Sequence, residues 1–281
     1  MIARDNGGPA WRPRLVALDV DGTLPAWTEV ETPADEPAGS RILAALYGVL
    51  AAGAHIVLCS GRAPGGITRV VDRLGLLDRV DDRMWLIASN GAALCRYAPL
   101  EVVHSETFDA RPAVHALLAR NPRALVAVEH ESGYRLTAPF PDGELPGDMI
   151  VTRLEELLAE PVGRVVVRDP AATPEEFVAL AAEVDLPGVD AAVGWSAWLD
   201  LTPAGVSKAS GLRHVCAALG LTATDVLAIG DGRNDIEMLR WAGRGVAVEQ
   251  APEDVLAAAD ATTAPAEEDG VAQELARWFP C

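Results

Sequence analysis

A short apolar run that ends in two carboxylates constrains the fold of this chain more than any other feature of its sequence. Leu15-Val16-Ala17-Leu18 is followed directly by Asp19-Val20-Asp21-Gly22-Thr23. Four consecutive apolar residues before a glycine turn are typical of a strand that is buried on both faces, as in a parallel sheet. Because open parallel sheets bind ligands at the carboxyl ends of their strands, Asp19 and Asp21 stand where a site would form. Two adjacent carboxylates repel each other unless a cation or a shared proton compensates; a plain Asp-Gly turn is the alternative interpretation.

The same pattern occurs a second time near the carboxyl terminus. An apolar run at residues 226–229 precedes Gly230-Asp231-Gly232-Arg233-Asn234-Asp235, and a helix is predicted over Ile236–Trp241. If the two apolar runs are neighbouring parallel strands, the second group of carboxylates lies beside Asp19 and Asp21. Hard divalent cations, Mg²⁺ above all, suit such a group of carboxylate oxygens. The sequence therefore predicts a metal site at one edge of a parallel sheet.

The composition limits the partners and the compartment. At 281 residues, half of them hydrophobic, the chain can form one large or two modest domains. A net charge of −18 argues against nucleic acid or an anionic membrane as a partner. No stretch reaches the ~18 apolar residues of a membrane span, and the amino terminus lacks the apolar segment of a signal peptide. The four cysteines are scattered without metal-ligand spacing, so we expect free thiols in a cytoplasmic protein.

One lysine stands out against this composition. Lys and Arg together number 23, and Lys208 is the only lysine among them. A bias toward arginine explains why lysine is scarce, but it does not explain the single exception. An ammonium is a compact point charge that a planar guanidinium cannot replace in a tight site. Lys208 is therefore a candidate functional residue, with chance survival of a surface lysine as the alternative.

The first part of the chain alternates predicted strands with predicted helices. The strands cover residues 14–18, 54–59 and 84–88, and the helices cover 39–52 and a segment that begins at Pro64. This alternation favours a parallel sheet with helices on both faces. The pattern resumes with a predicted helix over Lys208–Leu219.

The middle of the chain has a different pattern. It begins with a predicted hairpin at 94–97 and 102–107 and contains a predicted helix at 149–158. Antiparallel pairs of this kind indicate a separate α+β domain inserted into the first. We therefore predict an α/β protein whose parallel-sheet core consists of residues 1–91 and 203–281, with an inserted cap domain of residues 92–202.

These features resemble the four motifs of the haloacid dehalogenase superfamily of phosphohydrolases. The motifs are Asp19-Val20-Asp21-Gly22-Thr23, Ser60, Lys208 and Gly230-Asp231-Gly232-Arg233-Asn234-Asp235, in that order. The long insertion after Ser89-Asn90-Gly91-Ala92 resembles the Cof-like branch, whose α/β cap lies between the third core strand and the lysine. The resemblance covers both core segments and, for the cap, only its layout. It implies a Rossmann-like parallel sheet with an inserted α+β cap, and a Mg²⁺-dependent phosphatase.

The resemblance implies different roles for the two aspartates of the first motif. Asp19 would be the nucleophile that forms an aspartyl-phosphate. Asp21 would be the general acid that protonates the leaving alcohol and the base that then activates water, which requires the two pKa values to be pushed apart. Mg²⁺ would be held by carboxylate oxygens of Asp19 and Asp231 and by the backbone carbonyl of Asp21, and it would offset the repulsion between nucleophile and substrate.

The resemblance also implies a phosphate-binding group. Ser60, with the amides that follow it from Gly61 onward, and Lys208 would hold the phosphoryl oxygens as charge develops. Asn234 would contact phosphate or metal-bound water.

Four further residues have supporting or peripheral roles in this prediction. Thr23 would support the general acid by a hydrogen bond. Asp235 would help to orient the lysine, with a helix-start carboxylate as its alternative role. Arg62 and Asn90 are candidate substrate contacts, although Arg62 is also compatible with a solvent-exposed charge.

One turn departs from the pattern of the Cof-like branch. After the apolar residues 245–248, the chain has Glu249-Gln250-Ala251 where a small glycine-asparagine turn is common. The larger side chains, one of them acidic, either reshape the edge of the phosphate pocket or form a tolerated turn.

These expectations favour hydrolysis of a small phosphorylated metabolite, such as a sugar phosphate, by a monomer or homodimer. A phosphomutase is the second hypothesis. The cap arginines Arg123, Arg135, Arg164 and Arg168 leave room for it without forming a convincing basic cluster. A non-catalytic ligand-binding protein is the third hypothesis. A hydrolytic dehalogenase is disfavoured because Asp21 supplies the acid–base step of phosphoryl chemistry.

Overall fold

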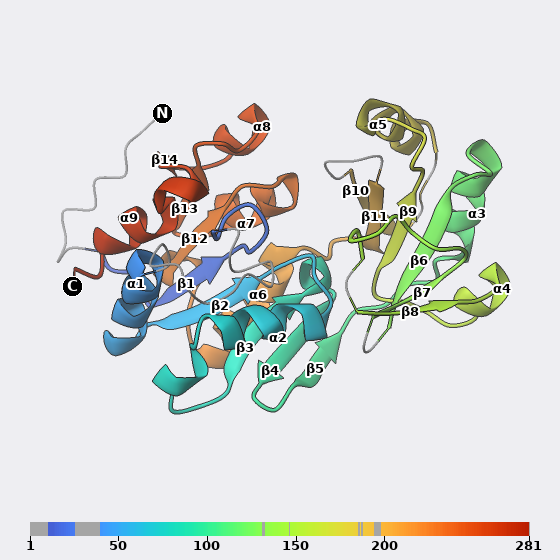
Figure 1. Cartoon of the computed structure of the whole chain (residues 1–281). Coiled ribbons are helices and arrows are strands. Elements are labelled where there is room, and N and C mark those ends of the chain that lie inside the picture. Colours follow the sequence, from blue (N-terminus) through green and yellow to red (C-terminus); the bar gives the residue numbers. More distant parts are fainter. Residues whose placement is uncertain are drawn as a thin grey trace. The chain divides into compact units, whose positions relative to one another are not determined.

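The computed structural model describes residues 11–25, 40–130, 133–145, 147–184, 186, 188–193 and 198–280 (Figure 1). The chain forms two compact units. One consists of residues 1–57, 78–81 and 213–281, and the other of residues 58–77 and 82–212. The elements comprise a parallel-rich sheet, a second sheet and helices, which confirms the predicted fold class. In the part of the chain that the structure describes, no helix is long and apolar enough to cross a bilayer.

The first unit contains a group of parallel strands. They are β1 (Leu15–Leu18), β12 (Val226–Gly230), β13 (Arg244–Val248) and β14 (Ala261–Thr263), in the order β14-β13-β12-β1. Every residue of β1 and β12 is buried, as expected for strands covered on both faces. Leu18 pairs with Ile229, so the acidic segments that follow β1 and β12 leave the sheet at the same level.

Short helices pack on these strands. The helix α1 (Ser40–Ala51) packs against α9 (Gly270–Ala276), while α7 (Ile236–Trp241) and α8 (Glu253–Leu256) pack against β13. The predicted bounds of α7 are confirmed, as are those of α6 (Lys208–Leu219), which begins in the second unit and ends in the first. The predicted start of α1 at Gly39 lies outside the described residues.

The large sheet has eight strands in the order β14-β13-β12-β1-β2-β3-β4-β5. Its remaining strands are β2 (His55–Cys59), β3 (Met84–Ala88), β4 (Ala93–Tyr97) and β5 (Glu101–Ser105). The pair β2–β3 is parallel, whereas β4 and β5 are antiparallel additions. The helix α2 (Pro64–Arg73) packs against β3 and β4 and begins at proline as predicted.

The hairpin of β4 and β5 corrects one expectation. The sequence pattern assigns it to the inserted domain, yet its strands extend the large sheet. Ala93–Tyr97 pair with Met84–Ala88 along their whole length. A hairpin has no local signal that tells which sheet edge it will join, because that edge belongs to a strand elsewhere in the chain. The residue limits of the inserted domain stay a prediction.

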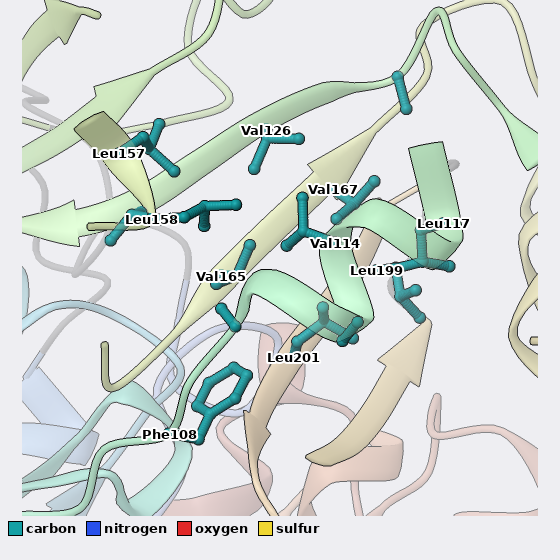
Figure 2. Packing of buried hydrophobic residues seen from close by; sticks show 14 of the residues in the cluster. Phe108, Val114, Leu117, Val126, Leu157, Leu158, Val165, Val167, Leu199 and Leu201 are labelled. Carbon is teal, nitrogen blue, oxygen red and sulfur yellow. The ribbon is translucent and has the colours of Figure 1, made fainter. Parts of the chain in front are cut away.

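A second sheet of six strands lies in the other unit, in the order β10-β11-β9-β6-β7-β8. Its strands are β6 (Leu125–His130), β7 (Gly133–Leu136), β8 (Asp148–Val151), β9 (Val165–Arg168), β10 (Val189–Val193) and β11 (Trp198–Pro203). Neighbours are antiparallel except for β7 and β8. Two helices, α3 (Arg111–Arg120) and α5 (Pro174–Glu183), contribute to the hydrophobic core on one face of this sheet. In that core Val114 and Leu117 lie close to Val167 and Leu199 (Figure 2).

The helix predicted at 149–158 is wrong in its first half. That segment forms β8, a break, and the single-turn helix α4 (Leu154–Leu157). A Cβ on Gly133 of β7 would lie 2.0 Å from the carbonyl oxygen of Asp148, so the pairing of these strands needs glycine at that position. Ile150 and Val151 are β-branched and suit a strand once a partner is present. The local pattern does not reveal that partner.

The described cysteines are buried, and none of them forms a disulfide. They are Cys59, Cys95 and Cys216; Cys281 lies outside the described residues. Burial raises the pKa of Cys95 to about 12 and that of Cys216 to about 11. Both thiols therefore stay protonated near neutral pH and have little nucleophilic character.

Candidate active site

Three buried aspartates meet at the carboxyl ends of β1 and β12. Asp19 follows β1, Asp231 follows β12, and Asp235 precedes α7. One carboxylate oxygen from each lies within 4.8 Å of the other two, and none of the three residues is more than 4% exposed. The Asp19 amide donates to the carbonyl of Ile229 at 3.0 Å, which ties the ends of the two strands together. The two acidic segments thus converge, as their positions after parallel strands predict.

The turn of the first motif fits closely against Asp231. Gly22 has a φ of +83°, and a Cβ there would lie 2.3 Å from Asp231 Oδ2. On the other carboxylate oxygen, Thr23 Oγ1 donates a hydrogen bond to Oδ1 at 3.0 Å. Glycine is therefore required both by the left-handed backbone and by the close approach. Thr23 gains a partner in Asp231, in addition to the support of Asp21 that the family resemblance implies.

Asp235 holds the loop after β12 in shape. Its Oδ2 accepts hydrogen bonds from the amides of Asp231 at 3.0 Å and Gly232 at 2.9 Å. Its own amide donates to the Gly232 carbonyl at 2.9 Å. These amides precede Asp235, and its side chain makes no capping hydrogen bond to α7, so the helix-capping alternative is not what the structure has. Because Asp235 also belongs to the carboxylate cluster, the same residue shapes the loop and adds negative charge to the site.

The side chains of Asp21, Asn234 and Arg233 do not belong to the carboxylate cluster. Asp21 is exposed, so the implied contact of this residue with a metal would be made by its backbone carbonyl. Asn234 is half-buried and folds over its own loop, since its Oδ1 would lie 2.4 Å from a Cβ on Gly232. The exposed Arg233 donates to Asp254 at 2.7 Å, which is a local surface contact.

The segment Ser60-Gly61-Arg62 after β2 is held by its neighbours on both sides. Ser60 is fully buried, and its amide donates to the Ile87 carbonyl at 2.9 Å. The Arg62 amide donates to Ser60 Oγ at 3.0 Å. The carbonyls of Ser60 and Arg62 accept from the amides of Asn90 at 3.0 Å and Ser89 at 2.9 Å. The loops after β2 and β3 are thus joined by backbone hydrogen bonds.

Residues 89–91 form a left-handed turn. Ser89, Asn90 and Gly91 have φ angles of 51°, 54° and 104°. The left-handed conformation costs residues with a Cβ about 1–2 kcal/mol each. A Cβ on Gly91 would lie 2.2 Å from the Ser207 carbonyl oxygen, so this turn packs directly on the residue before α6. Strain of this kind persists where the surrounding structure holds it and is frequent at functional sites.

Lys208 is the first residue of α6 and is fully buried. The helix start is stabilised by serines: the Ser207 amide donates to Ser210 Oγ at 2.9 Å, and the Ser210 amide to Ser207 Oγ at 3.4 Å. A cation is disfavoured at a helix amino terminus, and burial of an ammonium is costly unless it is compensated. The stability of α6 therefore does not explain this lysine, and its burial rules out the surface-lysine interpretation.

The predicted site residues fall into two groups. The first unit contains Asp19, Asp21, Thr23, Asp231, Asn234 and Asp235, and the second contains Ser60, Gly61, Arg62, Asn90 and Lys208. Within the second group, Gly61 and Arg62 are half-buried, whereas Asn90 is buried and packs over Gly61. The roles of these residues in a reaction stay predictions.

Gln250 makes contacts that the sequence did not reveal. Its Nε2 donates to the Gly22 carbonyl at 2.6 Å, and its Oε1 accepts from the Ala266 amide at 3.3 Å. The unusual Glu249-Gln250-Ala251 turn therefore braces the loop of the first acidic motif. Gln250 and Gly22 are 228 positions apart, so no local pattern could have linked them.

Comparison with known proteins identifies the family. The sequence profile of the haloacid dehalogenase-like hydrolases matches residues 16–275. A phosphoglycolate phosphatase of Natronomonas pharaonis is 30% identical over 265 residues, which span 93% of this chain and 96% of the relative. The sugar phosphatase BT4131, from subclass IIB of the same superfamily, superposes with a TM-score of 0.76 at 26% identity, over 94% of this chain and 98% of its own. The phosphatase BT1666 from Bacteroides thetaiotaomicron gives 0.75 at 25% identity, over 99% and 98%.

The chain therefore belongs to the haloacid dehalogenase-like hydrolases. It is an enzyme of the phosphatase class, a phosphoric monoester hydrolase, as the relatives and the matching solved structures indicate. The family assignment predicted from the four motifs is confirmed.

Proposed function

We propose that the chain is a Mg²⁺-dependent phosphatase of a small phosphorylated metabolite that works through an aspartyl-phosphate on Asp19. The observation that carries the proposal is the cluster of three buried carboxylates within 4.8 Å. Buried carboxylates at this separation repel each other strongly, and a divalent cation offsets that repulsion. The donor set consists of oxygens alone, which suits Mg²⁺ and does not suit softer metals.

The metal would be held by the side chains of Asp19 and Asp231 and by the backbone carbonyl of Asp21. When bound, Mg²⁺ supplies positive charge that allows an anionic nucleophile to approach an anionic phosphate. Thr23 and the close fit of Gly22 hold the Asp231 carboxylate in one orientation. Asp235 fixes the loop after β12, because its carboxylate accepts hydrogen bonds from the amides of Asp231 and Gly232.

The reaction then has two displacements at phosphorus. In the first, a carboxylate oxygen of Asp19 bonds to phosphorus while the bond to the substrate oxygen breaks, and Asp21 gives its proton to that leaving oxygen. In the second, Asp21 takes a proton from water as the water oxygen attacks phosphorus, which frees Asp19 and releases inorganic phosphate. The exposed position of Asp21 supports this role, because a shuttling acid must exchange protons with substrate and water.

Phosphoryl oxygens would be bound by Ser60, the amide of Gly61, Asn234 and Lys208. The loop after β2 and the left-handed turn after β3 are joined by backbone hydrogen bonds, so Ser60 and the Gly61 amide are preorganised before substrate arrives. Preorganised donors stabilise developing charge without reorganisation at the moment of reaction.

The substrate class we propose is a small phosphomonoester, with sugar phosphates first. One relative is named as a phosphoglycolate phosphatase and one matching structure as a sugar phosphatase, and both names denote small phosphorylated molecules. Arg62 and Asn90 are our candidate contacts for the rest of the substrate.

Three variants and one chelation step test the proposal. Phosphate release from a panel of phosphorylated metabolites and an aryl phosphate is measured with Mg²⁺ and with EDTA. Asp19→Asn should abolish turnover and Asp21→Asn should leave little. The matched control is Asp81→Asn, because Asp81 is exposed and precedes β3 at the opposite edge of the sheet. Near-normal rates in either site variant, or full activity in EDTA, would contradict the mechanism.

The structure gives less support to a phosphomutase. A mutase must retain a second phosphate group, which calls for unpaired cations in the cap. Three of the four cap arginines are paired: Arg164 with Asp200 at 2.7 Å, Arg168 with Glu144 at 2.9 Å, and Arg123 with Asp169 at 3.2 Å. The fourth, Arg135, is exposed. Measuring inorganic phosphate release against interconversion of sugar phosphates separates the two activities.

The oligomeric state and the location stay predictions. We expect a cytoplasmic monomer or homodimer, and light scattering during gel filtration measures which of the two forms exists.

A further inference from the structure

Two charged side chains of the six-stranded sheet extend to the loops after β2 and β3. Arg164 precedes β9, and its guanidinium donates to the Gly61 carbonyl, to Asp200 Oδ1 at 2.8 Å and to Tyr134 Oη at 3.1 Å. Glu129 in β6 accepts a hydrogen bond from Ser89 Oγ. The side chains of Arg164 and Glu129 are 7% and 13% exposed, so both contacts are largely withdrawn from water. All of these residues belong to one compact unit.

The Arg164 contact completes the support of the loop Ser60-Gly61-Arg62. Each of its three carbonyls accepts a hydrogen bond from a different donor: the Asn90 amide, the Arg164 guanidinium and the Ser89 amide. The peptide between Gly61 and Arg62 is planar, so a donor on its carbonyl also fixes the direction of its N–H. That N–H donates to Ser60 Oγ at 3.0 Å. Arg164 therefore orients the Ser60 hydroxyl through one rigid peptide.

The Glu129 contact supports the second loop. Ser89 and its neighbour Asn90 have the unfavourable left-handed backbone, with φ angles of 51° and 54°. The bond from Ser89 Oγ to the carboxyl group of Glu129 holds the first residue of this turn. Gly91 at the other end packs on Ser207, next to Lys208. The turn is thus held by the six-stranded sheet at one end and by the start of α6 at the other.

Stability alone gives no reason for charge at these positions. The same face of the sheet carries the apolar Ala127 and Val166, and apolar residues in place of a buried ion pair often leave stability unchanged or increased. Glu129 Oε2 is buried without a hydrogen-bond partner, 3.7 Å from Arg164. Burial raises the pKa of Glu129 in spite of the nearby Arg164; Asp200 raises it further, and Ser89 lowers it. Burial of Arg164 and Glu129 therefore costs free energy of folding, and both side chains bond to the loops at 60–62 and 89–91.

We propose that Arg164 and Glu129 are positioning residues that hold the loops at 60–62 and 89–91 in the shape that binds phosphate. The six-stranded sheet then contributes to phosphate affinity without contacting the phosphoryl group. The proposal rests on the proposed function in one respect, namely that Ser60 and Gly61 bind phosphate. It differs from a specificity role, because the effect falls on every phosphorylated ligand and on inorganic phosphate itself.

The test compares two buried arginines at the two ends of β9. Arg164→Met removes the guanidinium and keeps most of the apolar stem. The matched control is Arg168→Met, because Arg168 is equally buried, lies four residues along β9, and bonds Glu144 and the Asp169 carbonyl. We expect Arg164→Met to weaken inhibition by inorganic phosphate about tenfold and to raise KM for both an aryl phosphate and a sugar phosphate by a similar factor. Arg168→Met should stay within about twofold of the wild type in both measurements.

Two milder variants keep the test usable if Arg164→Met fails to fold. Arg164→Lys keeps the charge but loses the planar fork that reaches Gly61 and Asp200 together, so it should show a partial loss of phosphate affinity. Glu129→Gln keeps an acceptor for Ser89 and should change phosphate affinity less than Glu129→Ala. Folded Arg164 variants with wild-type phosphate inhibition, or an equal loss in Arg168→Met, would overturn the proposal.

Hydrogen exchange of the ligand-free protein separates this proposal from the proposed function. Arg164→Met should speed amide exchange in peptides that cover residues 59–63 and 88–92, and Arg168→Met should not. Faster exchange in a protein that hydrolyses no phosphomonoester would leave the support of the loops intact and remove the phosphatase. If Arg164→Met leaves amide exchange unchanged and the wild-type enzyme hydrolyses phosphomonoesters, the phosphatase proposal stands and the support of the loops by Arg164 is refuted.

Discussion

Replacement of Gly22 by alanine tests how closely the first motif fits against Asp231. Gly22 has a φ of +83°, and a Cβ there would lie 2.3 Å from Oδ2 and 2.8 Å from Cγ of Asp231. The left-handed backbone alone costs a residue with a Cβ about 1–2 kcal/mol. Because carbon atoms pack without strain only beyond roughly 3.5 Å, the carboxylate must also move by about 1 Å.

The movement of Asp231 has two measurable consequences. It breaks or bends the hydrogen bond from Thr23 at 3.0 Å, and a buried bond to a charged group contributes about 1.5–3 kcal/mol. Added to the backbone cost, this gives a loss of about 2.5–5 kcal/mol in the free energy of unfolding. A displacement of this size in a catalytic group also lowers kcat/KM by about 100-fold.

Gly53→Ala is the matched control. Gly53 has a φ of +75°, and a Cβ there would meet nothing within 4 Å. It lies just after α1 in the same unit, where left-handed glycines commonly end helices. Gly53→Ala should therefore lose about 1–2 kcal/mol and keep its kcat/KM.

Urea unfolding and kinetics with an aryl phosphate at several Mg²⁺ concentrations measure both effects. The reasoning fails if Gly22→Ala and Gly53→Ala lose equal stability and Gly22→Ala keeps its kcat/KM within about twofold of the wild type. Equal stability with a selective loss of activity would instead show that the carboxylate moves without strain in the fold.

Three further variants test separate contacts. Lys208→Met leaves the groups around a buried ammonium without their positive charge, so it should lower the free energy of unfolding by about 3–5 kcal/mol and the kcat of the folded protein by about 1,000-fold; a substantial residual rate would remove the lysine from the reaction. Gln250→Ala deletes the bond to Gly22 and should lower the free energy of unfolding by about 1 kcal/mol, with a mild rise in KM; urea unfolding that matches the wild type would show that the bond contributes nothing. For Glu129, burial raises the pKa above its ordinary 4.5, so folding favours the protonated form. The contribution of Glu129 to stability is fully present below pH 4.5 and is lost as the pH rises through the pKa of Glu129 in the folded protein. The wild type should therefore lose free energy of unfolding relative to Glu129→Gln as the pH rises through this range. A difference in free energy of unfolding between the two proteins that does not change with pH contradicts this prediction.

The local sequence was sufficient for the elements that carry the two acidic motifs. Runs such as 15–18 and 226–229 are apolar throughout, which is typical of a strand buried on both faces, and the glycine turns mark where each strand ends. Parallel pairing then brings the ends together with no further information, so the closeness of Asp19 to Asp231 could be predicted.

Elements that depend on a distant partner could not be predicted. The segment that begins at Met149 resembles a helix until β7 supplies a strand to pair with, and Gly133 permits that pairing. The hairpin of β4 and β5 is equally compatible with either sheet until the edge of β3 is available. In both cases the decisive hydrogen bonds join residues that no local pattern connects.

The site divides in the same way. The sequence by itself determined the chemical groups: two acidic strand ends, one serine and one lysine, in the order of a known family. The tertiary structure alone decided how they are held. Gln250 braces Gly22 from 228 positions away, and Arg164 reaches Gly61 across 103 positions. Chemistry is encoded in residue types that can be read one by one, whereas orientation depends on contacts that exist only after the chain has folded.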